Sequence, residues 1–215
     1  MATMQMSGAT WSSTAAAFLG MWVVMTAAMM LPSLVPTLWR YHTALRNAGA
    51  SRPSCLTMVA GAGYFVVWTV FGLAVFPLGV ALAAAEQQLP SLVRALPIAV
   101  GVVVLIAGAM QFTAWKARHL ALCRAATQLG CTLPPYAGMA WRYGLHLGLH
   151  CGISCAGPMA ILLAIGMMDL RTMAAVTAGI TLERLAPAGE RVARAIGIGD
   201  VAAGAFLVAR AVGLG

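Results

Sequence analysis

The chain has 215 residues, of which 61% are hydrophobic and only 8% are charged. Soluble domains carry roughly 25% charged residues, so this composition excludes an ordinary soluble protein and predicts an all-α, polytopic bundle of transmembrane helices. The net charge of +8 does not indicate a nucleic-acid partner, because the basic residues fall between apolar segments, where they contact anionic lipid headgroups. We expect a single integral-membrane domain over residues 1–215.

The apolar segments, taken in chain order, predict about six membrane crossings. A transmembrane helix needs about 20 apolar residues, and five of the segments reach that length. The sixth, residues 172–185, would span only about 21 Å of a core that is roughly 30 Å thick, so a re-entrant segment and five crossings are the alternative. The predicted spans are residues 14–39, 55–84, 96–115, 137–168, 172–185 and 195–214.

The distribution of basic residues favours six crossings. Arginines and the lysine cluster after the first and third spans and before the last one, whereas the intervening loops hold only Arg94 and Arg171. The positive-inside rule makes the basic loops cytoplasmic, with both termini outside a bacterial inner membrane. The first apolar segment lacks the basic region of a cleavable signal, so we expect it to be retained.

The first span is rich in methionine. Met21, Met25 and Met29 recur every four residues, and Met25 and Met29 would lie near mid-membrane. Thioethers favour Cu(I) and bind it without losing a proton, so Met25 and Met29 are candidate ligands, with Met4 and Met6 as candidates in the N-terminal tail. The alternative is packing, because methionine is a common core filler.

The loop after the third span holds a second pair of candidate ligands, His119 and Cys123. They are four residues apart and share a face if the helix continues beyond the membrane. The basic neighbours Lys116, Arg118 and Arg124 would favour the thiolate form of the cysteine, which binds soft metal ions. The alternative is a solvated helix that contacts lipid phosphates.

The fourth apolar segment carries the strongest metal-binding pattern, His146, His150, Cys151 and Cys155. Imidazoles and thiols inside a membrane are costly, so they indicate a functional site. Imidazole and thiolate ligands together favour Cu(I) or Zn(II) over magnesium or calcium.

Helical geometry restricts how these four side chains can act. Each residue turns by about 100°, so the two histidines share one face and the two cysteines share nearly the opposite face. Either the two pairs form two partial sites that other helices complete, or the helix breaks near Gly152 or Pro158. The sequence leaves both alternatives open.

Glycines repeat every four residues beside the cysteines, at Gly144, Gly148 and Gly152. Such a stripe of small residues lets another helix approach closely and predicts a helix–helix association. It also supplies the alternative for the cysteines, which are small residues suited to a tight interface.

Several landmarks recur along the chain, at residues 25–36, Gly108, Gln111, Lys116, Cys123, Arg124, Cys151, Cys155, 166–170, Leu182 and Glu183. Together they resemble a bacterial family of integral membrane proteins that are predicted to bind metal. The resemblance covers residues 22–183, and it implies a membrane-embedded metal site. The chain departs from the family pattern at His119 and Ser154, where the family has cysteines.

The residues and the resemblance predict a membrane protein that binds, transfers or transports a transition metal ion, with Cu(I) favoured over Zn(II). Expected partners are membrane lipids and a metallochaperone or partner membrane protein. We expect no enzymatic activity, because no hydrolase-like arrangement is present. One alternative is a structural or accessory subunit of a larger membrane complex. Another is a thiol oxidoreductase that uses Cys151 and Cys155, although their spacing differs from that of redox motifs.

Overall fold

The computed structural model describes residues 11–88, 90–129, 136–165, 169–186 and 188–213, and it excludes the side chains of residues 86, 90–94 and 123–129. Within these residues all regular structure is helical, as the sequence predicts, and no strand occurs. The described helices are α1 (Trp11–Asn47), α2 (Pro53–Gln88), α3 (Pro90–Met110), α4 (Ala114–Leu129), α5 (Ala137–Ser154), α6 (Ala156–Ile165), α7 (Leu170–Leu185) and α8 (Gly189–Ala211).

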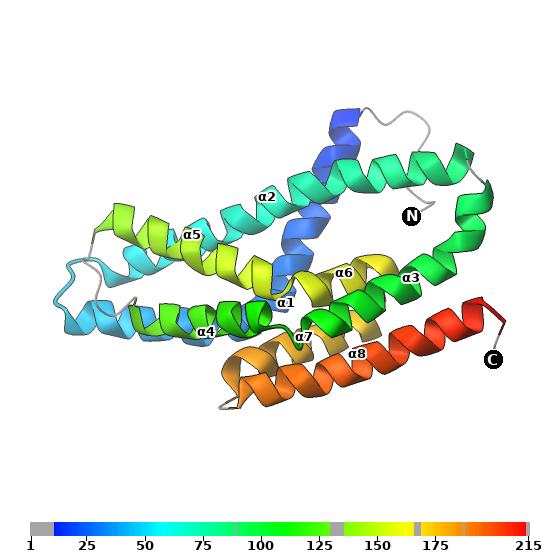
Figure 1. Cartoon of the computed structure of the whole chain (residues 1–215). Coiled ribbons are helices and arrows are strands. Elements are labelled where there is room, and N and C mark those ends of the chain that lie inside the picture. The colour runs from blue at the N-terminus through cyan, green and yellow to red at the C-terminus, as the bar shows by residue number, and fades with distance from the viewer. Residues whose placement is uncertain (1–10, 89, 130–135, 166–168, 187, 214–215) are drawn as a thin grey trace.

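The helices pack in two groups that share α7 (Figure 1). In the first group α2 lies along both α1 and α5, and α4 packs on the other side of α5. In the second group α3 lies along α8 over most of its length, and α6 packs on α3. Helix α7 contacts α1 as well as α8, so its residues reach the centre of the molecule.

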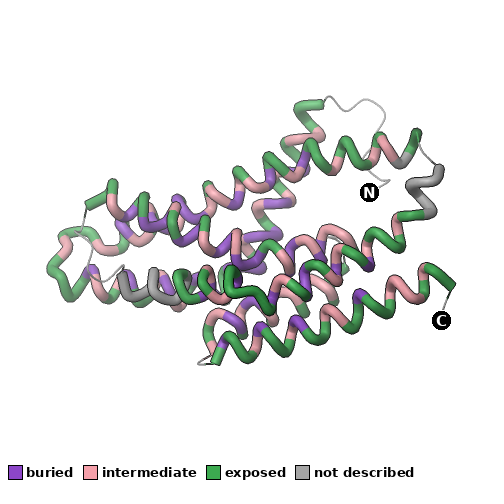
Figure 2. Tube along the Cα trace, in the orientation of Figure 1, coloured by how far each residue is buried: buried purple, intermediate pink, exposed green. Residues whose placement is uncertain are grey.

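The main core lies where α1, α2 and α5 meet, and Figure 2 shows buried residues concentrated there. Trp22 of α1 is almost fully buried, and its indole Nε1 donates a hydrogen bond to the carbonyl oxygen of Trp68 at 2.8 Å. This bond satisfies a polar group that would be costly to bury alone. The indole ring of Trp22 lies against Gly72 of α2, where no side chain separates α1 from α2.

Each predicted span overlaps described helices, and two of the spans contain a change of direction. The third predicted span, residues 96–115, extends past the end of α3, because α3 stops at Met110 and α4 leaves at an angle of 66°. The fourth, residues 137–168, contains a bend of 59° between α5 and α6. Hydrogen bonds to the carbonyls of residues 108–110 form the turn after α3 and end that helix.

Among the described residues, α1, α2 and α8 are long and apolar enough to cross a membrane. The number rises to five if each bent pair, α3 with α4 and α5 with α6, counts as one span. Helix α7 has 16 residues and is outside this set, so a sixth crossing stays a prediction.

The predicted glycine stripe is the contact surface of α5 on α2 of the same chain. A Cβ atom at Gly144 would overlap the carbonyl oxygen of Ala60, and one at Gly148 would lie 2.9 Å from the carbonyl oxygen of Tyr64. A Cβ atom at Gly152 would overlap the ring of Phe71. The two backbones therefore approach as closely as only glycine allows, which is the kind of contact that small residues permit between helices of membrane proteins.

We expect Gly144→Ala to destabilise the protein by about 1–3 kcal/mol, because the added methyl group meets rigid backbone of α2. Gly199→Ala in α8 is the matched control, since a Cβ atom there meets nothing within 4 Å. Thermal unfolding of the detergent-purified variants measures the difference. Equal melting temperatures for both variants would contradict this account of the α2–α5 contact.

Candidate metal centre

The bend between α5 and α6 follows from Pro158. An α-helical carbonyl accepts from the N–H group four residues later, and proline has no N–H group. The carbonyl oxygen of Ser154 therefore lacks its helical donor, and α5 ends at that residue. Cys155 stands at the junction, where its own N–H group still donates to the carbonyl oxygen of Cys151 at 2.9 Å. The observed break thus lies between the two positions that the sequence suggests, Gly152 and Pro158.

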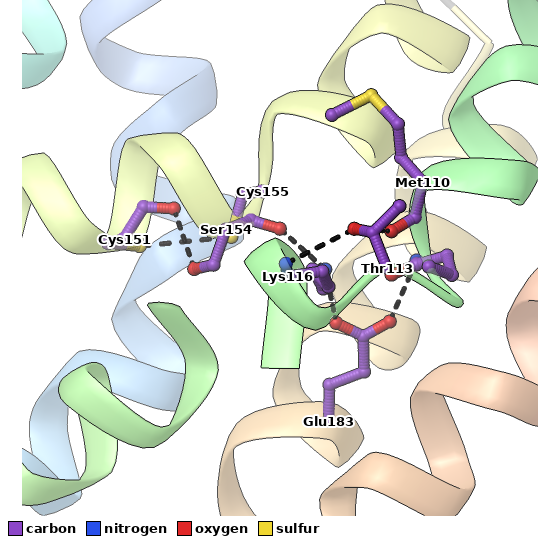
Figure 3. Close-up of polar contacts among 8 residues, drawn as sticks. Met110, Thr113, Lys116, Cys151, Ser154, Cys155 and Glu183 are labelled. Atoms are coloured by element: carbon purple, nitrogen blue, oxygen red, sulfur yellow. Dashed lines mark hydrogen bonds and ion pairs between the residues drawn. The ribbon is translucent and has the colours of Figure 1, made fainter. Parts of the chain in front are cut away.

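Lys116, the only lysine of the sequence, binds at this bend. Its Nζ donates to the carbonyl oxygen of Ser154 at 2.5 Å and lies 2.8 Å from Oε2 of Glu183 (Figure 3). The other carboxylate oxygen of Glu183 accepts from Nε2 of Gln111 at 2.9 Å. All of these side chains are buried, so the ion pair joins α4 and α7 to the break between α5 and α6.

Three sulfur atoms come together beside this bend. The Sγ atom of Cys151 lies 3.9 Å from the Sγ atom of Cys155 and 3.9 Å from the Sδ atom of Met30 in α1. Cys151 and Met30 are fully buried, Cys155 is nearly so, and both cysteines are free thiols. Cysteine and methionine sulfur are soft ligands, which favour ions such as Cu(I) and Zn(II).

Polar side chains surround the sulfur of Cys151. The hydroxyl of Tyr64 in α2 lies 3.0 Å from Sγ, and Nη1 of Arg184 in α7 lies 3.2 Å from it. The same Arg184 nitrogen donates to Oγ of Ser33 at 2.9 Å, and Ser33 in turn donates to the carbonyl oxygen of Met30 at 3.0 Å. A cation and two hydroxyl groups therefore hold the sulfur cluster between α1, α2, α5 and α7.

The two sulfur–sulfur distances from Cys151 match those of a three-coordinate metal ion. With metal–sulfur bonds of about 2.3 Å, two ligands of a trigonal site are roughly 4 Å apart. Both sulfur–sulfur distances from Cys151 agree with this value. Among the described residues, no three histidine, cysteine or acidic side chains converge on one point as they stand, and the third sulfur atom near Cys151 is the thioether of Met30.

The structure separates the cysteine pair from the histidine pair, as one of the two predicted alternatives requires. Cys151 and Cys155 face the sulfur cluster, whereas His150 approaches His119 of α4, with their Nδ1 atoms 3.3 Å apart. The ring centroid of His146 lies 6.1 Å from that of His150. The two pairs of candidate ligands therefore lie on different faces of α5, and their role in metal binding stays a prediction.

The remaining predicted ligands are not among the contacts of the sulfur cluster or of the histidines described above. Met25 and Met29 are buried in the core along α1, and their role as ligands stays a prediction. Cys123 belongs to α4, but its side chain, like Met4 and Met6, lies outside the described residues.

Sequence reasoning missed Met30, Tyr64 and Arg184 as neighbours of the cysteines. Met30 follows a predicted ligand directly, so the methionine pattern alone could have included it. Arg184 stands in a short apolar segment, where a charged side chain is a signal of function, although the sequence places it at a membrane boundary.

A family model described as PpoB2, copper chaperone, matches residues 19–207. The chain belongs to the PpoB2 copper chaperone family. The match spans most of the sequence and includes the sulfur cluster, the Lys116–Glu183 pair and the histidines of α4 and α5. It supports the expectation of a metal-handling family, and the description of that family points to copper. Neither the curated proteins nor the solved structures contain a match to this chain.

We expect Lys116→Met to destabilise this PpoB2-family protein by about 3–5 kcal/mol, because it leaves the carboxylate of Glu183 buried without its cation. The double variant Lys116→Met/Glu183→Leu should recover part of that loss, since it removes both charges. Thermal unfolding in detergent measures all three proteins. A double variant that is less stable than Lys116→Met would show that the charges do not act as a pair.

Proposed function

We propose that this protein binds Cu(I) as cargo at Met30, Cys151 and Cys155 and transfers it to a partner protein. The observation that carries the proposal is the position of the Cys151 sulfur, 3.9 Å from both a second thiol and a thioether. Membership of the copper chaperone family supports copper as the cargo. Three soft, buried ligands suit a monovalent copper ion that must be kept from water.

The charge at the site also favours Cu(I) over Zn(II). Cu(I) bound by two thiolates carries one net negative charge, and the guanidinium of Arg184, which stays protonated in proteins, supplies one positive charge within contact distance of Cys151. The ion pair of Lys116 and Glu183 is neutral as a unit. Zn(II) in the same place would leave one positive charge uncompensated, which is costly in a buried site.

We propose further that the helices hold this site within a membrane. The composition, the three to five helices of sufficient length and the apolar outer surface support this proposal. Large apolar side chains are exposed on several helices, which is expected of a surface that faces lipid. Examples are Val24, Val35, Val70, Leu73, Leu78 and Phe206.

A substitution series at the sulfur atoms tests the copper site. We expect anaerobically purified wild-type protein to show sulfur-coordinated Cu(I) by X-ray absorption, and we expect Cys151→Ser/Cys155→Ser to lose those sulfur ligands. Met30→Leu preserves volume but removes the thioether, so it should weaken Cu(I) binding by about tenfold or more.

Cys55→Ser is the control for this series, because Cys55 is an exposed thiol elsewhere in the molecule. It should bind Cu(I) as the wild type does. Unchanged sulfur coordination in Cys151→Ser/Cys155→Ser would rule out this site. Tight copurification of another membrane protein without copper would instead favour an accessory subunit.

Arg184 tests the charge argument. Arg184→Gln removes a charged contact to Cys151, and such contacts contribute about 1.5–3 kcal/mol, so Cu(I) affinity should fall by about tenfold or more. The preference for Cu(I) over Zn(II) should fall as well, whereas Arg184→Lys, which keeps the charge, should retain most of it. Competition titrations with both ions measure the preference. An unchanged preference in Arg184→Gln would show that Arg184 does not set the choice of ion.

A further inference from the structure

Three of the four histidines gather on α4 and α5, apart from the sulfur cluster. The Nδ1 atoms of His119 and His150 are 3.3 Å apart, although 31 positions separate these residues in the sequence. His146 precedes His150 by one helical turn, with 6.1 Å between the ring centroids. The fourth histidine, His42, lies elsewhere, where its Nε2 contacts Oγ of Ser54 at 3.3 Å.

The distance between the two Nδ1 atoms matches a metal site as well as a hydrogen bond. Metal–imidazole bonds are about 2.0–2.1 Å long, so two nitrogens of a tetrahedral site are roughly 3.3 Å apart. Histidines four residues apart on a helix, as His146 and His150 are, form a common ligand pair. As they stand, the three rings do not converge on one point. His146 is exposed, so its side chain can turn toward an ion held by His119 and His150 at little cost.

The surroundings of these rings leave nitrogen atoms for a ligand. Among the described residues, His119 and His150 have each other as polar partners, and no protein group binds the imidazole of His146. The ring of Trp115 packs edge-on against His119 with centroids 4.8 Å apart, which fixes the orientation of that ring. Imidazole nitrogen is a ligand that suits copper and zinc.

The difference in burial between the two groups of ligands points to their roles. The sulfur atoms of Cys151 and Cys155 are sealed inside the protein, whereas His119 and His150 are half-buried and His146 is exposed. His150 and Cys151 are adjacent residues, with Cα atoms about 3.8 Å apart and side chains that point about 100° apart around α5. An ion at the histidines would therefore be one helix face away from the sulfur cluster and still accessible from outside.

We propose that His119, His146 and His150 form a second copper site, in which copper is held at the surface of α4 and α5 before or after it occupies the buried sulfur site. The choice of copper as the ion rests on the proposed function, but the existence of the histidine site does not. A surface site with neutral ligands exchanges its ion with a partner more readily than a sealed thiolate site. The two sites together provide an exchange position and a storage position on one helix.

The test loads the detergent-purified full chain with Cu(I) under anaerobic conditions and measures copper content and X-ray absorption. Wild-type protein should bind about two copper ions per chain, with both sulfur and nitrogen ligands. Cys151→Ser/Cys155→Ser should bind about one ion with nitrogen ligands, and His119→Gln/His150→Gln should bind about one ion with sulfur ligands. His42→Gln is the matched control and should behave as the wild type does.

Nitrogen-coordinated copper that persists in His119→Gln/His150→Gln would overturn the histidine site, and so would a complete loss of copper from a folded Cys151→Ser/Cys155→Ser variant. Circular dichroism and gel filtration establish that each variant is folded. Because the histidines are at least partly exposed, their replacement by glutamine should leave the fold intact. Loss of nitrogen ligands in the histidine variant, with no change in the cysteine variant, would support this site and overturn the sulfur site instead.

Discussion

The contact on which the site depends most is the one between the ammonium group of Lys116 and the carbonyl oxygen of Ser154. Pro158 leaves that carbonyl without its helical donor, and the only lysine of the chain takes the donor's place. Lys116 also binds Glu183, and the next residue, Arg184, contacts the sulfur of Cys151. The buried ammonium group of Lys116 thus connects the bend between α5 and α6, where Cys155 stands, to α7. Helix α7 in turn carries Arg184, whose positive charge lies next to the thiol of Cys151. The position of the sulfur cluster follows from this connection.

Helix α5 presents two kinds of metal ligand in two directions because it packs between different neighbours. Its glycines bring it against α2 so closely that Tyr64 reaches Cys151, and the same face meets Met30 of α1. The opposite face turns toward α4, where His150 meets His119. The first surface is buried and rich in sulfur, whereas the second is partly exposed and carries imidazoles. Two environments with different accessibility therefore arise from the two faces of a single helix.

The quality of the sequence predictions varied with the range of the interactions involved. The helical class, the main apolar segments and the glycine contact follow from composition and periodicity, and the structure agrees with them. The end of α3 at Met110 was missed because the apolar run continues beyond it, and the turn depends on hydrogen bonds that apolarity does not reveal. The separation of cysteines from histidines was recognised as one of two alternatives, since a helix turns by about 100° per residue.

What the sequence by itself determined was which residue types are available and how they are spaced along each helix. The i,i+4 spacing placed Cys151 with Cys155 and His146 with His150, because helical geometry is local. Only the tertiary structure decided their partners. Met30 and Cys151 are 121 positions apart, and His119 and His150 are 31 apart, so their contacts depend on how α1 and α4 pack against α5. That packing depends on a proline-induced bend, a glycine contact surface and one buried ion pair, whose combined effect appears only when the whole chain is folded.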